Sequence, residues 1–202
     1  MMIKKFNSVL IIGMGLIGSS ISRALIENHV ANNLYGLDSD DKVIKKCQDL
    51  NLLIQGETNL ANFDIQFDLI IICAPLSMYE KIFFELDSYI SQPTLVTDVG
   101  STKMSTITDY NKLKKNTNIS FIPSHPIAGL EKSGPEFGFS KLFENRYCII
   151  TPFQKNDEAI DAISAMWKSI GMTIEIMEAE RHDRVLAMTS HIPQLIAFSV
   201  VG

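Results

Sequence analysis

Val9-Leu10-Ile11-Ile12-Gly13-Met14-Gly15-Leu16-Ile17-Gly18 is the most informative segment for the fold of this 202-residue chain. Its first four residues are apolar and branched, as in a strand that is buried on both faces. The glycines fit the pattern G-x-G-x-x-G, which opens the helix of dinucleotide-binding βαβ units. Residues 16–28 then carry apolar side chains at helical spacing. The stretch therefore predicts a strand, a glycine turn and a helix whose N-terminus faces a pyrophosphate.

The same alternation continues along the chain. Apolar strands are predicted at 34–37, 69–73, 94–97 and 120–122, and helices at 41–50, 78–86 and 102–113. Two more strands, 147–151 and 173–177, flank a predicted helix at 158–170. Fully apolar strands that alternate with helices are typical of a parallel sheet covered on both faces. We expect an α/β, Rossmann-type, doubly wound and mainly parallel sheet in a domain at 1–177. The remainder, 178–202, has the pattern of one helix with an uncovered apolar face.

Composition excludes several classes of partner. The formal net charge is −5 and no basic patch stands out, so we expect no nucleic acid. Cys47, Cys73 and Cys148 are widely spaced and odd in number, which predicts no metal site, no disulfide framework and a cytoplasmic location. Glycines interrupt the N-terminal apolar run, which argues against a signal peptide. No apolar stretch approaches about 20 residues, so no membrane span is expected.

An acidic residue follows the second strand at the position that the glycine motif requires. Asp38 lies twenty residues after Gly18. A carboxylate there can accept hydrogen bonds from the adenosine ribose and would repel a 2′-phosphate, so NAD is favoured over NADP. The alternative is a glycine turn beside an ordinary surface aspartate. Ala74 and Pro75 either form a turn against the cofactor or only stop their strand. The predicted cofactor-binding residues are Gly13, Gly15, Leu16, Ile17, Gly18, Asp38, Ala74, Pro75 and Gly100.

The segment 124–134 places His125 directly after a strand, where the nicotinamide end of a bound cofactor should lie. Oxidation of an alcohol needs a base for the hydroxyl proton, and imidazole, with a pKa of roughly 6.5, suits that task. An isolated histidine more often caps or packs a loop. The strand-end position and the polar, glycine-rich surroundings favour the base.

Four segments together resemble the prephenate/arogenate dehydrogenase family of tyrosine biosynthesis. They are Gly-Met-Gly-Leu-Ile-Gly-Ser-Ser at 13–20, Asp-Val-Gly-Ser-Thr-Lys at 98–103, Ser-His-Pro-Ile-Ala-Gly-Leu-Glu-Lys-Ser-Gly at 124–134 and Thr-Ser-His-Ile-Pro-Gln-Leu-Ile-Ala at 189–197. The resemblance runs from about Val9 to Gly202. The first segment is shared by many dehydrogenases, whereas the third joined to the fourth is much more specific.

The resemblance implies an NAD-dependent oxidative decarboxylation. Prephenate would lose hydride and carbon dioxide to give 4-hydroxyphenylpyruvate, and arogenate would give tyrosine. His125 matches the family's catalytic histidine, and Ser101 matches a serine that helps to orient it. The substrate-binding residues would be Ser124, Glu131, Ser190, His191 and Gln194. Gln194 stands where the family often has a histidine, and since glutamine carries no charge, the choice between prephenate and arogenate stays open.

The resemblance also implies a helical dimerisation and substrate domain, of which 178–202 would be the first helix. We expect a homodimer if that domain is complete, and we expect the chain to stop before an arginine that pairs with a substrate carboxylate. Two alternatives remain. One is another NAD(P)-linked enzyme, such as a β-hydroxyacid dehydrogenase or imine reductase, which commonly uses a lysine from a second-domain helix. The other is a non-catalytic, dinucleotide-binding fragment.

Overall fold

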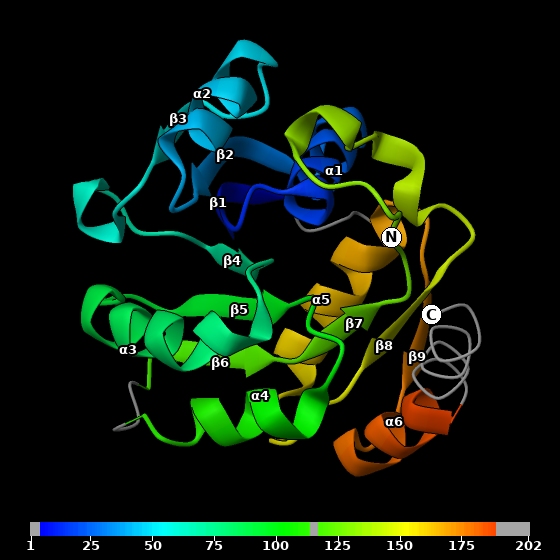
Figure 1. Cartoon of the computed structure of the whole chain (residues 1–202). Coiled ribbons are helices and arrows are strands. Elements are labelled where there is room, and N and C mark those ends of the chain that lie inside the picture. Colours follow the sequence, from blue (N-terminus) through cyan, green and yellow to red (C-terminus); the bar gives the residue numbers. More distant parts are fainter. Residues whose placement is uncertain (1–4, 114–116, 189–202) are drawn as a thin grey trace, which may run out of the picture.

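Six parallel strands form the main sheet of the described chain, which comprises residues 5–113 and 117–188 of a computed structural model (Figure 1). The strands are β1 (Phe6–Ile12), β2 (Ala31–Leu37), β3 (Gln55–Glu57), β4 (Leu69–Ile72), β5 (Thr94–Asp98) and β6 (Ile119–Ile122). Their order across the sheet is β3-β2-β1-β4-β5-β6, the order of a dinucleotide-binding Rossmann fold. The predicted fold class is confirmed. Strand β3 was not predicted, because its Gln-Gly-Glu sequence has no apolar pattern.

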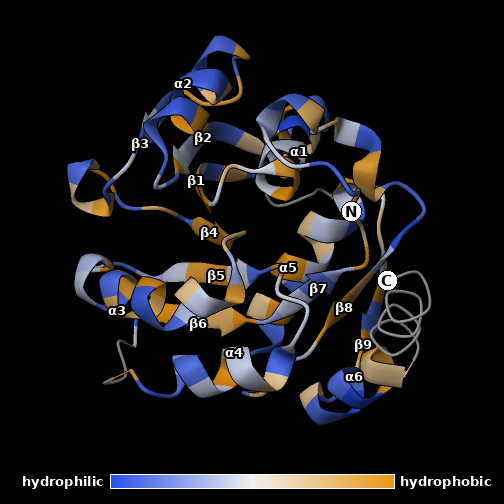
Figure 2. Cartoon of the chain, in the orientation of Figure 1, coloured by the Kyte–Doolittle hydropathy of each residue, from blue (hydrophilic) through white to orange (hydrophobic). Residues whose placement is uncertain are grey.

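Helices cover both faces of this sheet because alternate residues of each strand point to opposite sides. Val9 and Ile11 pack with α1 (Leu16–Glu27), α2 (Asp41–Asp49) and α5 (Asp157–Ser169). On the other face, Leu10 and Ile12 share a core with α3 (Tyr79–Tyr89), and α4 (Lys103–Tyr110) joins that side. In Figure 2 the central strand β4 is coloured as hydrophobic, whereas α2 on the outside is largely hydrophilic. The sheet is thus buried twice, as its uninterrupted apolar strands predict.

A second, smaller sheet extends the structure beside β6. It contains β7 (Ser124–Pro126), β8 (Tyr147–Ile150) and β9 (Thr173–Ile176), with β7 antiparallel and β9 parallel to β8. The strands predicted near 147–151 and 173–177 are confirmed, and they belong to this separate sheet. The segment at 124–126, which directly follows the predicted strand at 120–122, forms a strand of its own. Pro126 is tolerated in a strand here because β7 lies at the sheet edge.

Short 3-10 helices complete the connections: η1 (Leu60–Asn62), η2 (Leu76–Met78), η3 (Pro135–Phe137) and η4 (Ser140–Phe143). After β9, helix α6 (Ala179–Leu186) packs beside α4 (Figure 1). The chain continues as π-helix at residues 187–188. The rest of the helix predicted over 178–202 lies outside the described residues, so the division at 177 stays a prediction. In the described ranges, no helix has the length and apolar character to cross a bilayer.

Candidate active site

The glycine turn after β1 needs each of its three glycines for a different reason. Gly13 has a φ of +94°, and a Cβ there would lie 2.7 Å from the Cys73 carbonyl group. A Cβ on Gly18 would overlap the Gly13 carbonyl oxygen, so this glycine lets α1 approach the turn. A Cβ on Gly15 would meet no described atom within 4 Å. Only Gly15 therefore borders open space, at the place where the motif brings a pyrophosphate close to the backbone.

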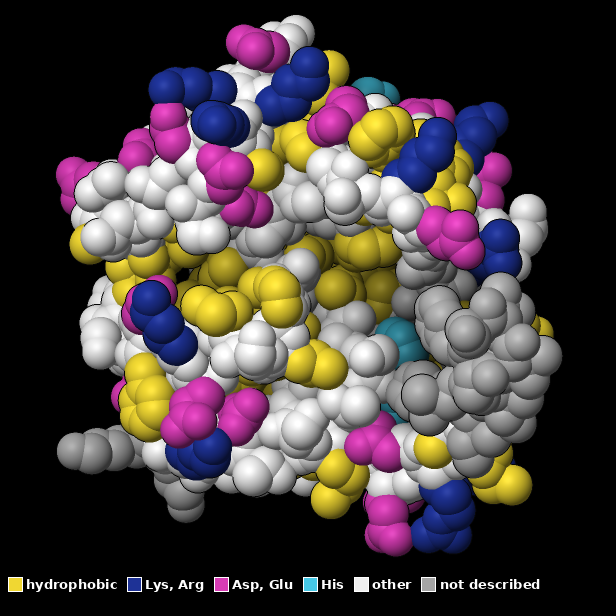
Figure 3. All heavy atoms as spheres, viewed as in Figure 1, with side chains coloured by type: hydrophobic (Ala, Val, Ile, Leu, Met, Phe, Trp, Pro, Cys, Tyr) yellow, Lys and Arg dark blue, Asp and Glu magenta, His cyan; other side chains and the backbone are white. Residues whose placement is uncertain are grey.

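A cavity of about 620 Å³ opens at this turn, beyond the carboxyl ends of β1, β2 and β4. This edge of the sheet, next to the point where the strand order reverses, is where such folds bind their ligands. Five predicted cofactor-binding residues line the cavity: Gly13, Gly15, Asp38, Ala74 and Pro75. Figure 3 shows a central hollow in this face of the molecule, with hydrophobic side chains on its floor. Leu16 and Ile17 instead belong to the first turn of α1, and they can contribute backbone N–H groups.

Asp38 is held at the cavity by the backbone. Its carboxylate accepts the N–H of Met14 at 2.8 Å and that of Asp40 at 3.0 Å. These bonds fix a negative charge beside the glycine turn. The described lining of the cavity includes one cationic side chain, Lys81, whose Nζ lies 3.7 Å from a carboxylate oxygen of Glu85. This charge pattern suits ribose hydroxyls better than a 2′-phosphate.

A larger hollow of about 840 Å³ runs along η1 and α3 and shares Asn59, Leu60, Lys81 and Glu85 with the cavity. Its lining contains neither the glycine turn nor Asp38. This hollow is the larger of the two, but the glycine turn and Asp38, which a dinucleotide site needs, line the smaller cavity. We therefore assign the cofactor to the smaller one.

His125 contacts a second histidine, which no sequence pattern singled out. The Nδ1 atom of His125 lies 2.9 Å from Nε2 of His182, and the ring centroids are 5.1 Å apart. His182 Nδ1 in turn lies 2.7 Å from Oδ1 of Asp183. His125 is carried by β7 and the other two residues by α6. The result is a row of hydrogen-bonding groups from Asp183 through His182 to His125.

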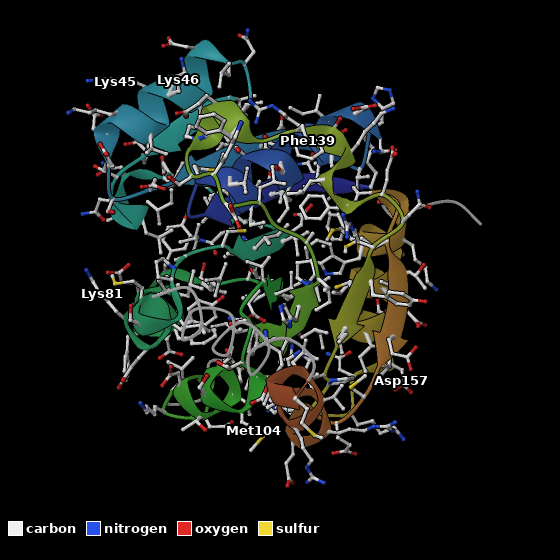
Figure 4. All side chains as sticks on the ribbon, turned by 45° about the vertical axis from the view of Figure 1, so that its right-hand side comes forward. Lys45, Lys46, Lys81, Met104, Phe139 and Asp157 are labelled. Atoms are coloured by element: carbon white, nitrogen blue, oxygen red, sulfur yellow. The ribbon has the colours of Figure 1, made fainter. Side chains whose placement is uncertain are left out.

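Asp183 is fixed to the beginning of α4. Its Oδ1 accepts the N–H of Lys103 at 2.8 Å, and its Oδ2 accepts the N–H of Met104 at 3.0 Å. In Figure 4, Met104 is labelled where α4 runs next to α6. Partial burial raises the pKa of Asp183, but hydrogen bonds from these two N–H groups and from His182 outweigh it, and the net pKa is lowered. The carboxyl group is therefore ionised at neutral pH.

His182 itself is fully buried. Burial lowers its pKa, and this effect outweighs the opposing effect of Asp183. His182 is therefore a neutral imidazole at neutral pH.

A buried ion pair lies beneath His125. The Nζ atom of Lys103 donates to Oδ2 of Asp98 at 2.6 Å and to the Ser124 carbonyl oxygen at 2.7 Å. The Ser124 N–H donates to Oδ1 of Asp98 at 3.0 Å. Burial lowers the pKa of Lys103, although Asp98 opposes the shift. The pair holds the backbone on which His125 stands.

Ser124 has its side chain inside the protein. Its hydroxyl lies 2.7 Å from that of Thr97 and accepts a hydrogen bond from Trp167 Nε1 at 3.2 Å. The residue has no exposed surface. Ser124 is predicted to bind substrate, but in this structure its side chain packs inside the protein and anchors the strand that carries His125.

The remaining predicted residues have different surroundings. Ser101 is partly buried between β5 and α4, and within the described residues no hydrogen bond joins it to His125. Gly100 is buried against Leu76, and its N–H donates to Asp98 rather than lining the cavity. Glu131 is exposed on the segment between β7 and η3. Ser190, His191 and Gln194 lie outside the described residues.

Sequence reasoning missed His182 and Asp183. The contact between His182 and His125 joins residues 57 positions apart on a helix and a strand. Adjacent helical residues normally point in different directions, so a His-Asp pair in a helix carries no pattern of its own. The one available signal is that a buried histidine needs a hydrogen-bond partner, and Asp183 stands next to His182 in the sequence.

The protein has the strand order, the glycine turn and the acidic residue after β2 that define the dinucleotide-binding α/β domains of dehydrogenases. It also has a histidine shortly after β6. A family model described as the nucleotide-binding domain of prephenate dehydrogenase matches residues 21–176. The chain belongs to this family, as its sequence motifs predicted.

Relatives support the assignment over nearly the whole chain. A cyclohexadienyl dehydrogenase of Zymomonas mobilis is 35% identical over 201 residues, which cover 98% of this chain and 67% of that protein. A prephenate dehydrogenase of Bacillus subtilis is 32% identical, with 96% of this chain and 53% of that protein covered. The crystal structure of prephenate dehydrogenase from Aquifex aeolicus, in complex with hydroxyphenyl propionate and NAD+, superposes with a TM-score of 0.90 at 33% identity. That match covers 96% of this chain and 68% of the crystal structure. The chain thus spans from about half to two thirds of these proteins.

Proposed function

We propose that this chain is the dinucleotide-binding, proton-accepting part of an NAD-dependent prephenate or arogenate dehydrogenase. The observation that carries the proposal is the position of His125, held at the strand ends by two polar networks in a chain of this family. The substrate class comes from the relatives, which are named as prephenate and cyclohexadienyl dehydrogenases. The product would be 4-hydroxyphenylpyruvate from prephenate or tyrosine from arogenate.

The residues of the cavity fit a bound NAD. The space beside Gly15 is the one a pyrophosphate would fill, and the free N–H groups at the start of α1 would face its negative charge. Asp38 would accept hydrogen bonds from the adenosine ribose and disfavour NADP. Bound NAD would supply the hydride acceptor.

The chain itself would handle the proton. His125 would accept the proton of the ring hydroxyl while hydride leaves the hydroxyl-bearing carbon for NAD. The bond between the ring and its carboxylate would then break to release carbon dioxide. Ser101 would lie near that hydroxyl. Glu131, Ser190, His191 and Gln194 are proposed to contact the substrate. A homodimer and a cytoplasmic location are part of this proposal and rest on the sequence alone.

The alternatives have weaker support. A β-hydroxyacid dehydrogenase would need a lysine as its proton-transferring group, but Lys103, which contacts the backbone next to His125, is buried and paired with Asp98. A non-catalytic dinucleotide-binding protein would need the same cavity but not the histidine network. That network favours turnover.

The test is NADH absorbance after prephenate, or separately arogenate, is mixed with the chain and NAD. We expect NADH formation that falls by about 10²–10⁴-fold in His125→Asn, the usual contribution of a general base. The matched control is His29→Asn, because His29 is an exposed residue with a φ of 55°, which asparagine tolerates. NAD affinity, measured by calorimetry, should not change in either variant. A folded chain that binds NAD but oxidises neither substrate would overturn the proposal.

A further inference from the structure

We propose that His182 and Asp183 are positioning residues that fix the tautomer of His125, so that its Nε2 atom carries the lone pair. Asp183 sets the tautomer of His182, and His182 then sets that of His125. The role of this lone pair in turnover rests on the proposed function. The tautomer itself is a property of the chain and can be measured without turnover.

The inference begins with the contact between the two rings. A distance of 2.9 Å between His125 Nδ1 and His182 Nε2 is that of a hydrogen bond, so one hydrogen lies between them. Two arrangements satisfy the distance. In the first, His125 Nδ1 donates to His182, and the lone pair of His125 that can accept a proton is on Nε2. In the second, His182 Nε2 donates to His125, and the lone pair of His125 is on Nδ1 and points toward α6.

Asp183 decides between the two arrangements. An ionised carboxylate only accepts, so His182 Nδ1, 2.7 Å away, must carry a hydrogen. A neutral imidazole has one N–H, and burial keeps His182 neutral. Its Nε2 is therefore the acceptor, and His125 Nδ1 is the donor. The neutral His125 then has its lone pair on Nε2.

The relay is anchored at its far end. Asp183 cannot easily turn away from His182, because the N–H groups of Lys103 and Met104 hold both carboxylate oxygens. His182 has no exposed surface, so its ring cannot easily reorient into water. Packing and hydrogen bonds thus select one arrangement of Asp183 and His182 on α6 and His125 on β7, and the N–H groups of α4 hold it in place.

The same arrangement suits a base. When His125 Nε2 takes the substrate's hydroxyl proton, His125 becomes an imidazolium that still donates from Nδ1 to His182. The carboxylate of Asp183 lies beyond that ring and offsets the new positive charge. Other charged groups nearby are Lys103 and Asp98, which neutralise each other. The Cys148 thiol on β8 is neutral, since burial raises its pKa.

Nitrogen-15 NMR of the histidine-labelled chain tests the proposal directly. Two-bond proton–nitrogen correlations distinguish an Nδ1–H from an Nε2–H imidazole, and His→Asn variants of the four histidines assign the signals. We expect His125 and His182 both as Nδ1–H near pH 8. A wild-type His125 found as Nε2–H would overturn the proposal without any variant at position 182.

Two substitutions at position 182 separate hydrogen bonding from packing. His182→Phe keeps a ring but removes the acceptor, so His125 should move toward the Nε2–H form that imidazole prefers in water. His182→Gln keeps an acceptor near the Nε2 position and should restore the Nδ1–H form. The matched control is Glu180→Gln, an exposed change on the same helix, and it should change nothing. If a folded His182→Phe keeps the wild-type tautomer, the relay does not set it.

Kinetics provides the second test. With a substrate that is turned over, kcat should fall about 10-fold or more in His182→Phe and recover in His182→Gln, while KM for NAD stays unchanged. A purely structural role would raise KM or lower the folded fraction instead. If no substrate is oxidised, the proposed function fails, and the NMR result still decides whether the relay exists.

Discussion

The Asp183 carboxylate accepts the N–H of Lys103 at 2.8 Å, so a side chain of α6 caps the first turn of α4. No side chain of α4 itself does this in the described structure, and its first turn has no acidic residue. The N-terminal N–H groups of a helix need such acceptors, and the helix dipole favours a negative charge there. One residue therefore joins the histidine relay to the helix that also supplies Lys103.

Removing this cap should destabilise the chain. Asp183→Ala is expected to lower the free energy of unfolding by about 1–2 kcal/mol, the usual cost of a lost N-terminal cap. Urea unfolding followed by circular dichroism measures it. Asp161→Ala on the exposed side of α5 is the control and should change stability by less than about 0.5 kcal/mol. Equal effects of the two substitutions would show that the cap contributes nothing.

His182 should make stability depend on pH. Its pKa is lowered in the folded chain by burial, so its contribution is complete above the unfolded value of roughly 6.5. As pH falls below that value, the unfolded chain takes up a proton that the folded chain resists, and stability is lost. Asp183 on α6, His125 on β7 and the Lys103–Asp98 pair face this ring.

We therefore expect the unfolding free energy of the wild type to fall more steeply between pH 7 and 5 than that of His182→Gln. Urea unfolding at several pH values gives the comparison. His29→Asn is the control, because it removes an exposed histidine. Parallel curves for wild type and His182→Gln would contradict the prediction.

The strand-end side of the site was predictable because all parallel strands present their carboxyl ends at one sheet edge. Gly13, Asp38 and Ala74 each follow a strand in the sequence, and the structure places all three in the cavity lining at that edge. His125 lies instead within β7, which pairs with β8 in the second sheet. The main strands were found because double burial demands continuous apolar runs. The predicted helix boundaries agree with the observed ones to within a few residues, because the residues that begin and end a helix act over a short range in the sequence.

What the sequence did not reveal depends on contacts between distant elements. Strands β3 and β7 are short and polar, and they are defined by their neighbours rather than by their own pattern. The Asp183–His182–His125 row needs α6 to lie against both α4 and β7, which no periodicity encodes. Ser124 illustrates the same limit, because the family resemblance implied that it binds substrate, whereas its side chain is fully buried in the structure.

The Lys103–Asp98 pair should be costly to break from one side. Lys103→Met would leave the Asp98 carboxylate fully buried without its cation, which typically costs about 3–5 kcal/mol. Lys112→Met is the control, because Lys112 pairs with Glu80 and Asp109 at the surface and such pairs contribute at most about 1 kcal/mol. Chemical denaturation measures both. Similar losses in the two variants would show that burial does not amplify the interaction.

Gly15 and Gly18 should fail in different ways when changed to alanine. A Cβ at position 15 meets no described atom, so Gly15→Ala should fold with wild-type stability but occupy the space of the pyrophosphate. NAD affinity should fall at least about tenfold, or ~1.4 kcal/mol. A Cβ at position 18 overlaps the Gly13 carbonyl oxygen, so Gly18→Ala should lose about 1–3 kcal/mol of stability as well as NAD binding.

Thermal unfolding and calorimetry with NAD separate these two outcomes. Gly129→Ala is the control, because that glycine is also surrounded by open space but lies away from the cavity lining. It should change neither quantity. If Gly15→Ala bound NAD normally, the cofactor would not approach the backbone at this turn, and the assignment of the cavity between β1, β2 and β4 would have to be abandoned.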